Sequence, residues 1–416
     1  MSAVATATAF ADRTARWAAV GLGFSIPIST AIDGILSAVV LAAWLASGSY
    51  RGKLDAVKHN PVALAALMLF AMLMVGAFYG DASAQEAGRY LTKYADLLLI
   101  PVCLVLFRDA DTRRAGIYAL ASALVATVAL SYALRAGMPR PGWLIDDLFF
   151  HVPFKHKLTH AVLVAFATFL FFQLALAART PSARWGWLAA SVLSVINLAF
   201  VVPGGTGYVV FGTLLLYAGY ALRGYGGLLA MMVVGAHCAV LIYQISDTAR
   251  VRVDRALQEY SAWTTGGSAS AITPRAGVEE SSVGQRLTFY RETLRITRDH
   301  PFAGVGTGGF PKAYAEKARE AGSLEVRNPH NEYLLVMSQN GVIGLLLLLY
   351  LFWRHWQLAP RLATPLETHL ARGLVLTISA GCLVNSFLLD HTEGLLFAWM
   401  TGLLFAGLDQ GRDARA

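Results

Sequence analysis

The sequence predicts an all-α polytopic membrane protein with about twelve transmembrane helices and one large loop, and three observations support this. The 416-residue chain is 56% hydrophobic and only 14% charged, whereas soluble domains are about one quarter charged. Its charges fall in short clusters between apolar runs, many of them near the ~20 residues that a helix needs to cross ~30 Å of hydrocarbon. A single long polar segment, 245–331, interrupts this pattern. Only helices satisfy every backbone group in such apolar runs.

The apolar runs place the predicted spans along the chain. The first follows Arg13 and Arg16 and resembles a signal peptide, but a second run follows almost at once, so we interpret it as a retained span. The spans cover residues 17–30, 33–47, 61–79, 91–107, 115–134, 159–177, 185–202, 207–222, 226–244, 332–353, 369–389 and 393–408. The chain therefore divides into spans 1–9 (1–244), the loop (245–331), and spans 10–12 with a tail (332–416).

Basic clusters predict the orientation, because cytoplasmic loops carry an excess of lysine and arginine. The clusters flanking alternate spans fall on one side with both termini, which are therefore expected in the cytoplasm. The formal charge of +8 is then explained by topology and anionic partners rather than by nucleic acid. Four basic residues on the outer side break the pattern: Arg89, Lys93, Lys155 and Lys157. An anionic ligand or lipid headgroups at that face would explain them.

The large loop is predicted to contain two surface helices, at 247–260 and 282–298, joined by a Gly/Ser/Thr-rich linker at 264–274. The less polar stripe of the second helix is Leu287, Tyr290, Leu294 and Thr297, and a row of arginines occupies another face. Arg286 points differently from that row and is the better candidate for ligand contact. Four glycines follow within 304–309. They allow tight turns but follow a helix, so they form neither a P-loop nor a Rossmann fingerprint.

His330 lies where the loop meets the tenth span. Polar groups at such a position cost free energy unless they have a functional or structural role. A histidine there can take a proton from an attacking hydroxyl, while nearby cations neutralise a departing diphosphate. From spacing alone, a structural role as a helix cap is equally compatible. The sequence has no HExxH and no cysteine pair for zinc, and no Gly-x-Ser-x-Gly elbow. The outer face gathers His330, Asn331, Glu332, Arg286, Lys93, Arg89, Asp390, His391 and Glu393.

Several of these segments together resemble the O-antigen ligase and polymerase superfamily. They are Arg286, 301–310, 328–334 and 341–344, while 385–394 and Lys93-Tyr94 resemble the ligase branch. The resemblance implies a GT-C-like glycosyltransferase that moves O-antigen polysaccharide from undecaprenyl diphosphate to a sugar hydroxyl of lipid A core. The reaction would invert the anomeric centre, use no metal and no cofactor, and occur at the periplasmic face of the Gram-negative inner membrane. Its partners would be the lipid-linked donor, the lipid A core and membrane lipids.

The resemblance also assigns roles to residues. His330 matches the family's essential histidine and Arg286 its loop arginine, which makes them the expected catalytic pair. Family members show Arg-Thr-Gly where this chain has Gly205-Thr206-Gly207, so either another basic residue substitutes or the diphosphate is bound more weakly. The expected donor-binding residues are Arg286, Lys93, Arg89, Lys155, Lys157 and Tyr290. The expected acceptor or supporting residues are Asn331, Glu332, Thr206, Asp390, His391 and Glu393.

Other functions remain open at this point. An O-antigen polymerase or a protein O-oligosaccharyltransferase of the same superfamily would share the histidine–arginine chemistry and differ in acceptor. A polytopic transporter or flippase is the alternative from another class. Transporters show repeats and charged residues at the bilayer midplane, whereas this chain has no convincing internal repeat and gathers its ionisable residues at one interface. We therefore favour the enzyme.

Overall fold

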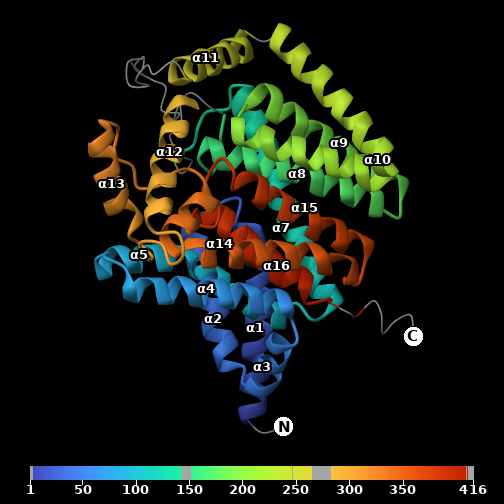
Figure 1. Cartoon of the computed structure of the whole chain (residues 1–416). Coiled ribbons are helices and arrows are strands. Elements are labelled where there is room, and N and C mark those ends of the chain that lie inside the picture. The colour runs from blue at the N-terminus through green and yellow to red at the C-terminus, as the bar shows by residue number, and fades with distance from the viewer. Residues whose placement is uncertain (1–2, 143–150, 246, 265–282, 409, 411–416) are drawn as a thin grey trace.

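The computed structural model in Figure 1 describes residues 3–142, 151–245, 247–264, 283–408 and 410. Within these ranges every regular element is a helix, which confirms the all-α prediction for that part of the chain. The elements are α1 (Ala3–Ser25), α2 (Thr30–Ala46), α3 (Tyr50–Lys58), α4 (Pro61–Tyr79), α5 (Ala84–Tyr94), η1 (Ala95–Leu98), α6 (Leu99–Leu106), α7 (Ala110–Arg135), α8 (Lys157–Ala177), α9 (Pro181–Ile196), η2 (Asn197–Val201), α10 (Gly205–Ile245), α11 (Asp247–Thr264), α12 (Val283–Asp299), α13 (Phe310–Ala321), α14 (Glu332–Leu358), η4 (Ala359–Arg361), α15 (Pro365–Gly381) and α16 (His391–Phe405).

Six of the described helices are long and apolar enough to cross a membrane, or seven if the bent pair α2–α3 counts as one span. The six include α4, α7, α8, α10 and α14, and α9 extended through η2. Several other predicted spans are short or broken: α15 has 17 residues and α16 has 15, and 91–107 is divided among α5, η1 and α6. The chain is thus a polytopic membrane protein, and the number twelve remains a prediction.

Helix α10 folds back on itself at Arg223 and Gly224, whose backbone angles are not helical. The φ of Gly224 is +60°, a conformation that glycine adopts without steric penalty. Across the bend, a Cβ built on Gly227 would lie 2.0 Å from the carbonyl oxygen of Gly219. The two arms therefore touch backbone to backbone, and the reversal falls between the predicted spans 207–222 and 226–244.

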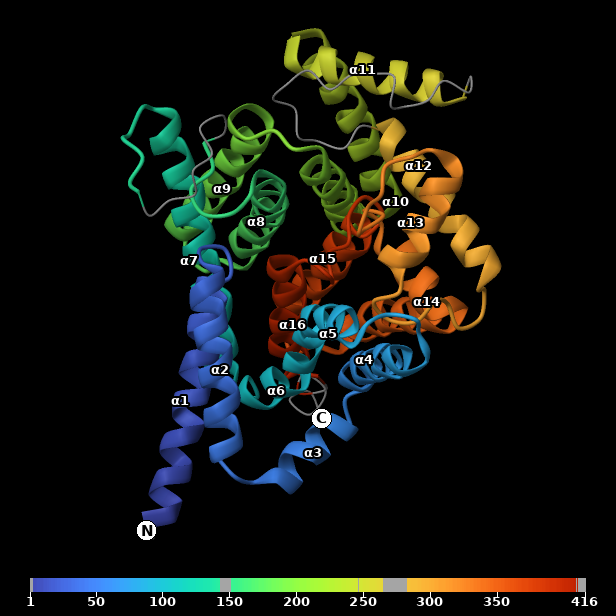
Figure 2. The same ribbon diagram turned by 90° about the vertical axis from the view of Figure 1, so that its left-hand side faces the viewer.

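Two groups of helices are joined by α15. Helix α14 packs on α4, and α16 packs on α6 and η1, whereas α8 packs on α9 and α10. Helix α15 contacts α8, α10, α14 and α16. Helices α1 and α2 form a hairpin against α7, and Figure 2 shows them lengthwise, side by side. In Figure 1, α5, α12 and α13 gather at the left-hand edge of the molecule.

Helices α11 and α12 lie where two loop helices were predicted. The predicted linker 264–274 lies outside the described residues except for Thr264. The predicted stripe on α12 is wrong at Leu294, which is 52% exposed. The buried face of α12 instead contains Phe289, Glu292 and Ile296. Glu292 can be buried because Arg291 and Arg295 donate to it at 2.9 and 2.7 Å, so the arginine row is partly a set of ion pairs.

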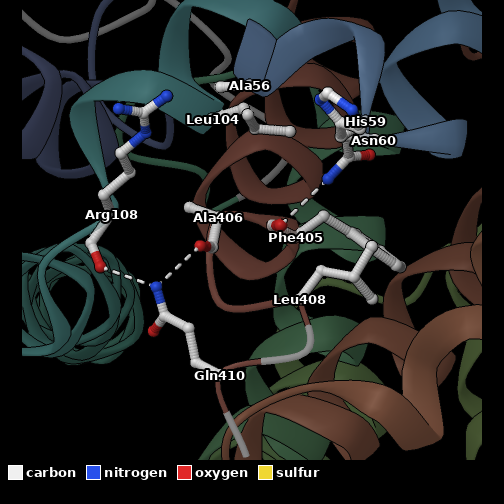
Figure 3. Close-up of a pocket in the computed structure, with 9 residues that line it drawn as sticks. All are labelled: Ala56, His59, Asn60, Leu104, Arg108, Phe405, Ala406, Leu408 and Gln410. Carbon is white, nitrogen blue, oxygen red and sulfur yellow. Dashed lines mark hydrogen bonds between the residues drawn. The ribbon is translucent and has the colours of Figure 1, made fainter. Parts of the chain in front are cut away.

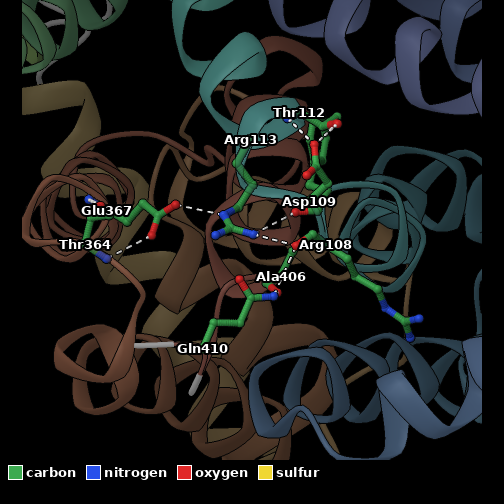
Figure 4. A network of polar contacts seen from close by, with 9 residues as sticks. Arg108, Asp109, Thr112, Arg113, Thr364, Glu367, Ala406 and Gln410 are labelled. Carbon is green, nitrogen blue, oxygen red and sulfur yellow. Dashed lines mark hydrogen bonds and ion pairs between the residues drawn. The ribbon is translucent and has the colours of Figure 1, made fainter. Parts of the chain in front are cut away.

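A buried ion pair between Arg113 and Glu367 ties the start of α7 to the start of α15, as Figure 4 shows. The Nε of Arg113 lies 2.8 Å from Oε1 of Glu367, and the two side chains are 2% and 7% exposed. Arg113 also donates to the carbonyls of Phe107 and Arg108. Glu367 completes a capping box with Thr364. Both carboxylate oxygens of Glu367, and the Nε and Nη1 of Arg113, therefore have partners, as a buried pair requires.

We predict that Arg113→Met destabilises the protein by about 3–5 kcal/mol, because it leaves the carboxylate of Glu367 buried without its counter-ion. The double variant Arg113→Met/Glu367→Gln should recover much of that loss. Thermal unfolding in detergent measures both. The matched control is Arg114→Met, since Arg114 and Asp111 form an exposed pair at 3.6 Å and exposed pairs contribute little. Equal destabilisation by Arg113→Met and Arg114→Met would contradict the prediction.

A cavity of about 290 Å³ lies among α3, α4, α6 and the end of α16 (Figure 3). Asn60 donates to the carbonyl of Phe405, and Gln410 donates to the carbonyls of Arg108 and Ala406. These amides thus hold backbone segments together. The cavity borders the last turn of α16, whereas Asp390 precedes its first turn. It therefore lies far along α16 from the predicted catalytic residues.

Candidate functional site

The glycine-rich loop between α12 and α13 packs into a break in α14. At Gly341, within that break, φ is +63°. The amides of Val305 and Gly306 donate to the carbonyls of Ser338 and Gln339 at 2.9 and 2.8 Å, and the amide of Thr307 donates to Gly76 at 3.0 Å. The loop's amides are thus used by the protein itself. The loop fastens α12, which carries Arg286, to α14 and α4 rather than forming a phosphate cradle.

His330 precedes α14 with a constrained backbone. Its φ is +54°, which is uncommon outside glycine and costs free energy unless neighbours fix it. The His330 amide donates to Oδ1 of Asn328 at 2.8 Å, and the hydroxyl of Ser386 donates to the same oxygen at 2.8 Å. The hydroxyl of Tyr290 donates to the His330 carbonyl at 3.2 Å. Contacts from α12 and from the segment before α16 therefore hold this residue in place.

The imidazole of His330 begins a chain of three polar side chains. Its Nδ1 lies 3.1 Å from Oδ1 of Asn385, and Nδ2 of Asn385 lies 2.7 Å from Oδ2 of Asp390. The ring also lies beside Phe289, with centroids 6.3 Å apart. All three polar residues are half-buried. The histidine is thus oriented from one edge of its ring by a carboxamide that a carboxylate holds.

Positive charge surrounds this chain. Burial raises the pKa of Asp390, and the charges of Lys93 and of a protonated His330 oppose that rise. Burial likewise raises the pKa of Tyr290, and the charge of Arg286 opposes that rise. Tyr290 contacts the His330 carbonyl. Of the predicted site residues, His330 and Asp390 are therefore joined through Asn385, and Lys93 and Arg286 interact electrostatically with Asp390 and Tyr290.

Three other predicted site residues support the loops around His330. The Tyr290 hydroxyl also donates to the carbonyl of Leu383 at 3.0 Å. Asn331 caps α14 by accepting from the amide of Leu334, and donates to Leu383 at 3.0 Å. Glu332 is fully buried and accepts from the Tyr94 hydroxyl at 2.5 Å and from the Leu388 amide at 3.1 Å. Their polar atoms are already engaged, which favours scaffolding over direct contact with a donor diphosphate.

Lys155 and His391 belong to a second cluster centred on Asp33. Lys155 Nζ and His391 Nε2 each lie 3.5 Å from Oδ2 of Asp33, and Ser25 donates to Oδ1 at 2.6 Å. Burial lowers the pKa of Lys155, and the charges of Asp33 and Glu393 oppose this. The bond to Asp33 is the main cause that raises the pKa of His391. Lys155 thus already has a carboxylate partner, which the sequence did not indicate.

The remaining predicted residues are dispersed. Arg89 is exposed and pairs with Glu86 at 3.1 Å. Lys157 is buried at the start of α8, and Thr206 is buried at the start of α10. The donor-binding roles of Arg89 and Lys157 and the acceptor or supporting role of Thr206 stay predictions.

Sequence reasoning missed Asn385 and Asn328 as site residues. Asn385 lies 55 positions from His330 in the chain, so no local periodicity connects them. Asn328 was part of the polar stretch before α14, but its side chain was given no role. The sequence feature that could have identified these two asparagines is that each lies in a segment that resembles the family.

An integral membrane protein whose histidine is oriented by an amide and a carboxylate, with a lysine that acts on that carboxylate, has features of a membrane-embedded group transferase. The O-antigen ligase family model matches residues 157–349, from α8 through Arg286 and His330 into α14. This match supports the O-antigen ligase superfamily, which the sequence predicted. A search of curated proteins finds no match.

The match to this family model indicates the general function of the protein. It indicates a glycosyltransferase-like enzyme of the O-antigen ligase and polymerase type, whose partners are lipid-linked polysaccharide and the lipid A core in general terms.

The position of the family's missing arginine has room for a side chain, because a Cβ built on Gly205 meets nothing within 4 Å.

Proposed function

We propose that this protein is an O-antigen ligase that transfers O-antigen polysaccharide from undecaprenyl diphosphate to a sugar hydroxyl of lipid A core. The observation that carries the proposal is that His330, joined through Asn385 to Asp390, lies in the segment that the O-antigen ligase model matches. The charges of Lys93 and Arg286 act on Asp390 and on Tyr290, the neighbours of this histidine. The reaction takes place at the periplasmic face of the inner membrane, with both termini in the cytoplasm. The outer position of this site follows from the distribution of basic residues in the sequence.

In the proposed reaction His330 is the general base. Its Nε2 takes the proton of the acceptor hydroxyl, and the acceptor oxygen forms a bond to the anomeric carbon of the donor. The bond from that carbon to the phosphate oxygen breaks, and undecaprenyl diphosphate leaves with the electron pair. Attack from the face opposite the leaving group inverts the anomeric centre. No protein–glycan covalent intermediate is needed.

Arg286 and Lys93 neutralise the diphosphate as its charge grows. A guanidinium can hold two phosphate oxygens at once, and Arg286 on α12 is only half-buried. Lys93 at the end of α5 is exposed and lies close enough to lower the pKa of Asp390. The two cations therefore approach the region of His330 from different helices.

We predict that Arg286→Ala raises the donor KM by about 10–100-fold, because a charge-assisted hydrogen bond contributes about 1.5–3 kcal/mol. The acceptor KM should change little. The matched control is Arg291→Ala on the same helix, since Arg291 is exposed and pairs with Glu292. Steady-state transfer with each substrate varied in turn measures the effect. An unchanged donor KM in Arg286→Ala would remove this residue from the donor site.

The acceptor is tested by offering alternatives to the purified protein. Undecaprenyl-diphosphate glycan is supplied with lipid A core, with a second glycan, or with a pilin-like protein. The proposal predicts transfer to lipid A core. Transfer only to the second glycan would identify a polymerase, and transfer only to protein would identify a protein O-oligosaccharyltransferase.

A further inference from the structure

We propose that Asn385 is a positioning residue that holds the His330 imidazole in the tautomer with a hydrogen on Nδ1 and a free electron pair on Nε2. Asp390 holds Asn385 in the orientation that makes this possible. The inference rests on the proposed role of His330 as general base, and it adds a reason why that histidine is ready to accept a proton.

The hydrogen bonds determine which atom carries each proton. An ionised carboxylate only accepts hydrogen bonds, so the group that faces Asp390 at 2.7 Å must be the NH₂ of Asn385. The carboxamide oxygen of Asn385 then faces His330 Nδ1 at 3.1 Å. A carboxamide oxygen is also only an acceptor, so Nδ1 must donate. A neutral imidazole has one N–H, and Nε2 is therefore the basic nitrogen.

The segment that carries Asn385 is fixed relative to His330. The Asn385 amide donates to the carbonyl of Gly381 at 2.9 Å. Its neighbour Ser386 donates to Asn328, and the same oxygen of Asn328 accepts from the His330 amide. The two segments are thus joined next to the pair of side chains itself, which limits the ways in which the carboxamide can rotate away.

Asp390 must be ionised for this arrangement. Burial raises its pKa, while the positive charge of Lys93 on α5 opposes that rise, as does the charge of His330 whenever the imidazole is protonated. The carboxylates whose charges interact with that of Asp390 are Glu332 on α14 and Glu393 on α16. A protonated Asp390 is able to donate to the Asn385 oxygen, which would turn the NH₂ toward His330 and place the electron pair on the wrong ring nitrogen.

A carboxamide and a carboxylate orient a histidine with different consequences. Both accept from Nδ1–H and select the same tautomer. Only the carboxylate adds a full negative charge, which stabilises the protonated imidazolium. Replacing Asn385 by aspartate keeps an acceptor for Nδ1–H but removes the NH₂ that donates to Asp390. Two adjoining carboxyls then share one proton, which places the negative charge of the pair next to the imidazole, whereas leucine of similar size removes the acceptor.

The test is the pH dependence of kcat/KM for glycan transfer by the purified full-length protein, with undecaprenyl-diphosphate glycan and lipid A core. Asn385→Asp should retain activity at high pH, with the acid limb moved toward higher pH by about 1 unit or more. Asn385→Leu should lose at least about 10-fold in kcat, with a donor KM close to that of the wild type. Thermal unfolding of each variant verifies folding, and the isosteric aspartate variant keeps the test valid if the leucine variant does not fold.

The outcomes separate this inference from the proposed function. An acid limb that does not move in Asn385→Asp, in a protein that His330→Ala inactivates, overturns the positioning role alone. Full activity of His330→Ala overturns the proposed function itself. If Asn385→Leu lowers the unfolding temperature but leaves the kcat of the folded protein unchanged, Asn385 has a structural role only. That result would also overturn the inference.

Discussion

Replacing His330 by alanine is expected to lower the rate of glycan transfer by about 10²–10⁴-fold, the contribution that a positioned general base typically makes. The imidazole is the one titratable ring joined to the Asn385–Asp390 chain among the described contacts. Its removal leaves the acceptor hydroxyl without a group to take its proton. Donor binding should persist, because Arg286 and Lys93 remain.

Single-turnover transfer with saturating donor measures this loss, and a donor-binding assay on the same sample separates chemistry from binding. The control is His300→Ala, since His300 is exposed at the end of α12 and belongs to neither cluster. Wild-type rates in the control are expected. Wild-type rates in His330→Ala would remove the histidine from the mechanism.

Replacing Gly306 by alanine is expected to lower the apparent Tm by about 10 °C and to reduce transfer together with it. The φ of Gly306 is +84°. A Cβ at this position would lie 2.3 Å from the Cα of Gly80 and 2.7 Å from the carbonyl oxygen of Gly76. These are backbone atoms at the end of α4, so no side chain can rotate to make room. The loop would have to leave the break in α14, which also displaces α12.

The matched control is Gly88→Ala on α5, where a Cβ meets nothing within 4 Å. Alanine has the higher helix propensity, so this variant should be neutral or slightly more stable. Thermal unfolding in detergent compares the two substitutions. Equal stability of Gly306→Ala and Gly88→Ala would show that the loop does not pack as described.

The sequence predicted much of the fold because long apolar runs restrict a membrane chain to helices. The place of His330, Arg286, Lys93 and Asp390 near the ends of such runs, and the family resemblance, led to their assignment to one site, which stays a prediction. Helix α12 was located correctly, but its buried face was not. Periodicity treats Glu292 as a surface residue, whereas two arginines allow it to be buried.

Partners that are distant in the chain account for the rest. Lys155 was predicted to meet a diphosphate, yet Asp33, 122 positions away, already faces it. The Tyr290 hydroxyl was predicted to bind donor, and it instead supports the carbonyls of His330 and Leu383. A sequence shows which side chains are charged and which can donate a hydrogen bond. It does not show which of them are already paired, because that depends on contacts formed only after folding.

We propose that His330 and the cations Arg286 and Lys93 act on one lipid diphosphate. The most direct measurement is an experimental structure of the protein in lipid with its undecaprenyl-diphosphate-linked glycan bound. We expect phosphate oxygens within about 4 Å of Arg286 and Lys93, with the anomeric carbon on the side of His330 Nε2. A diphosphate bound at the Asp33–Lys155 cluster, away from His330, would contradict it.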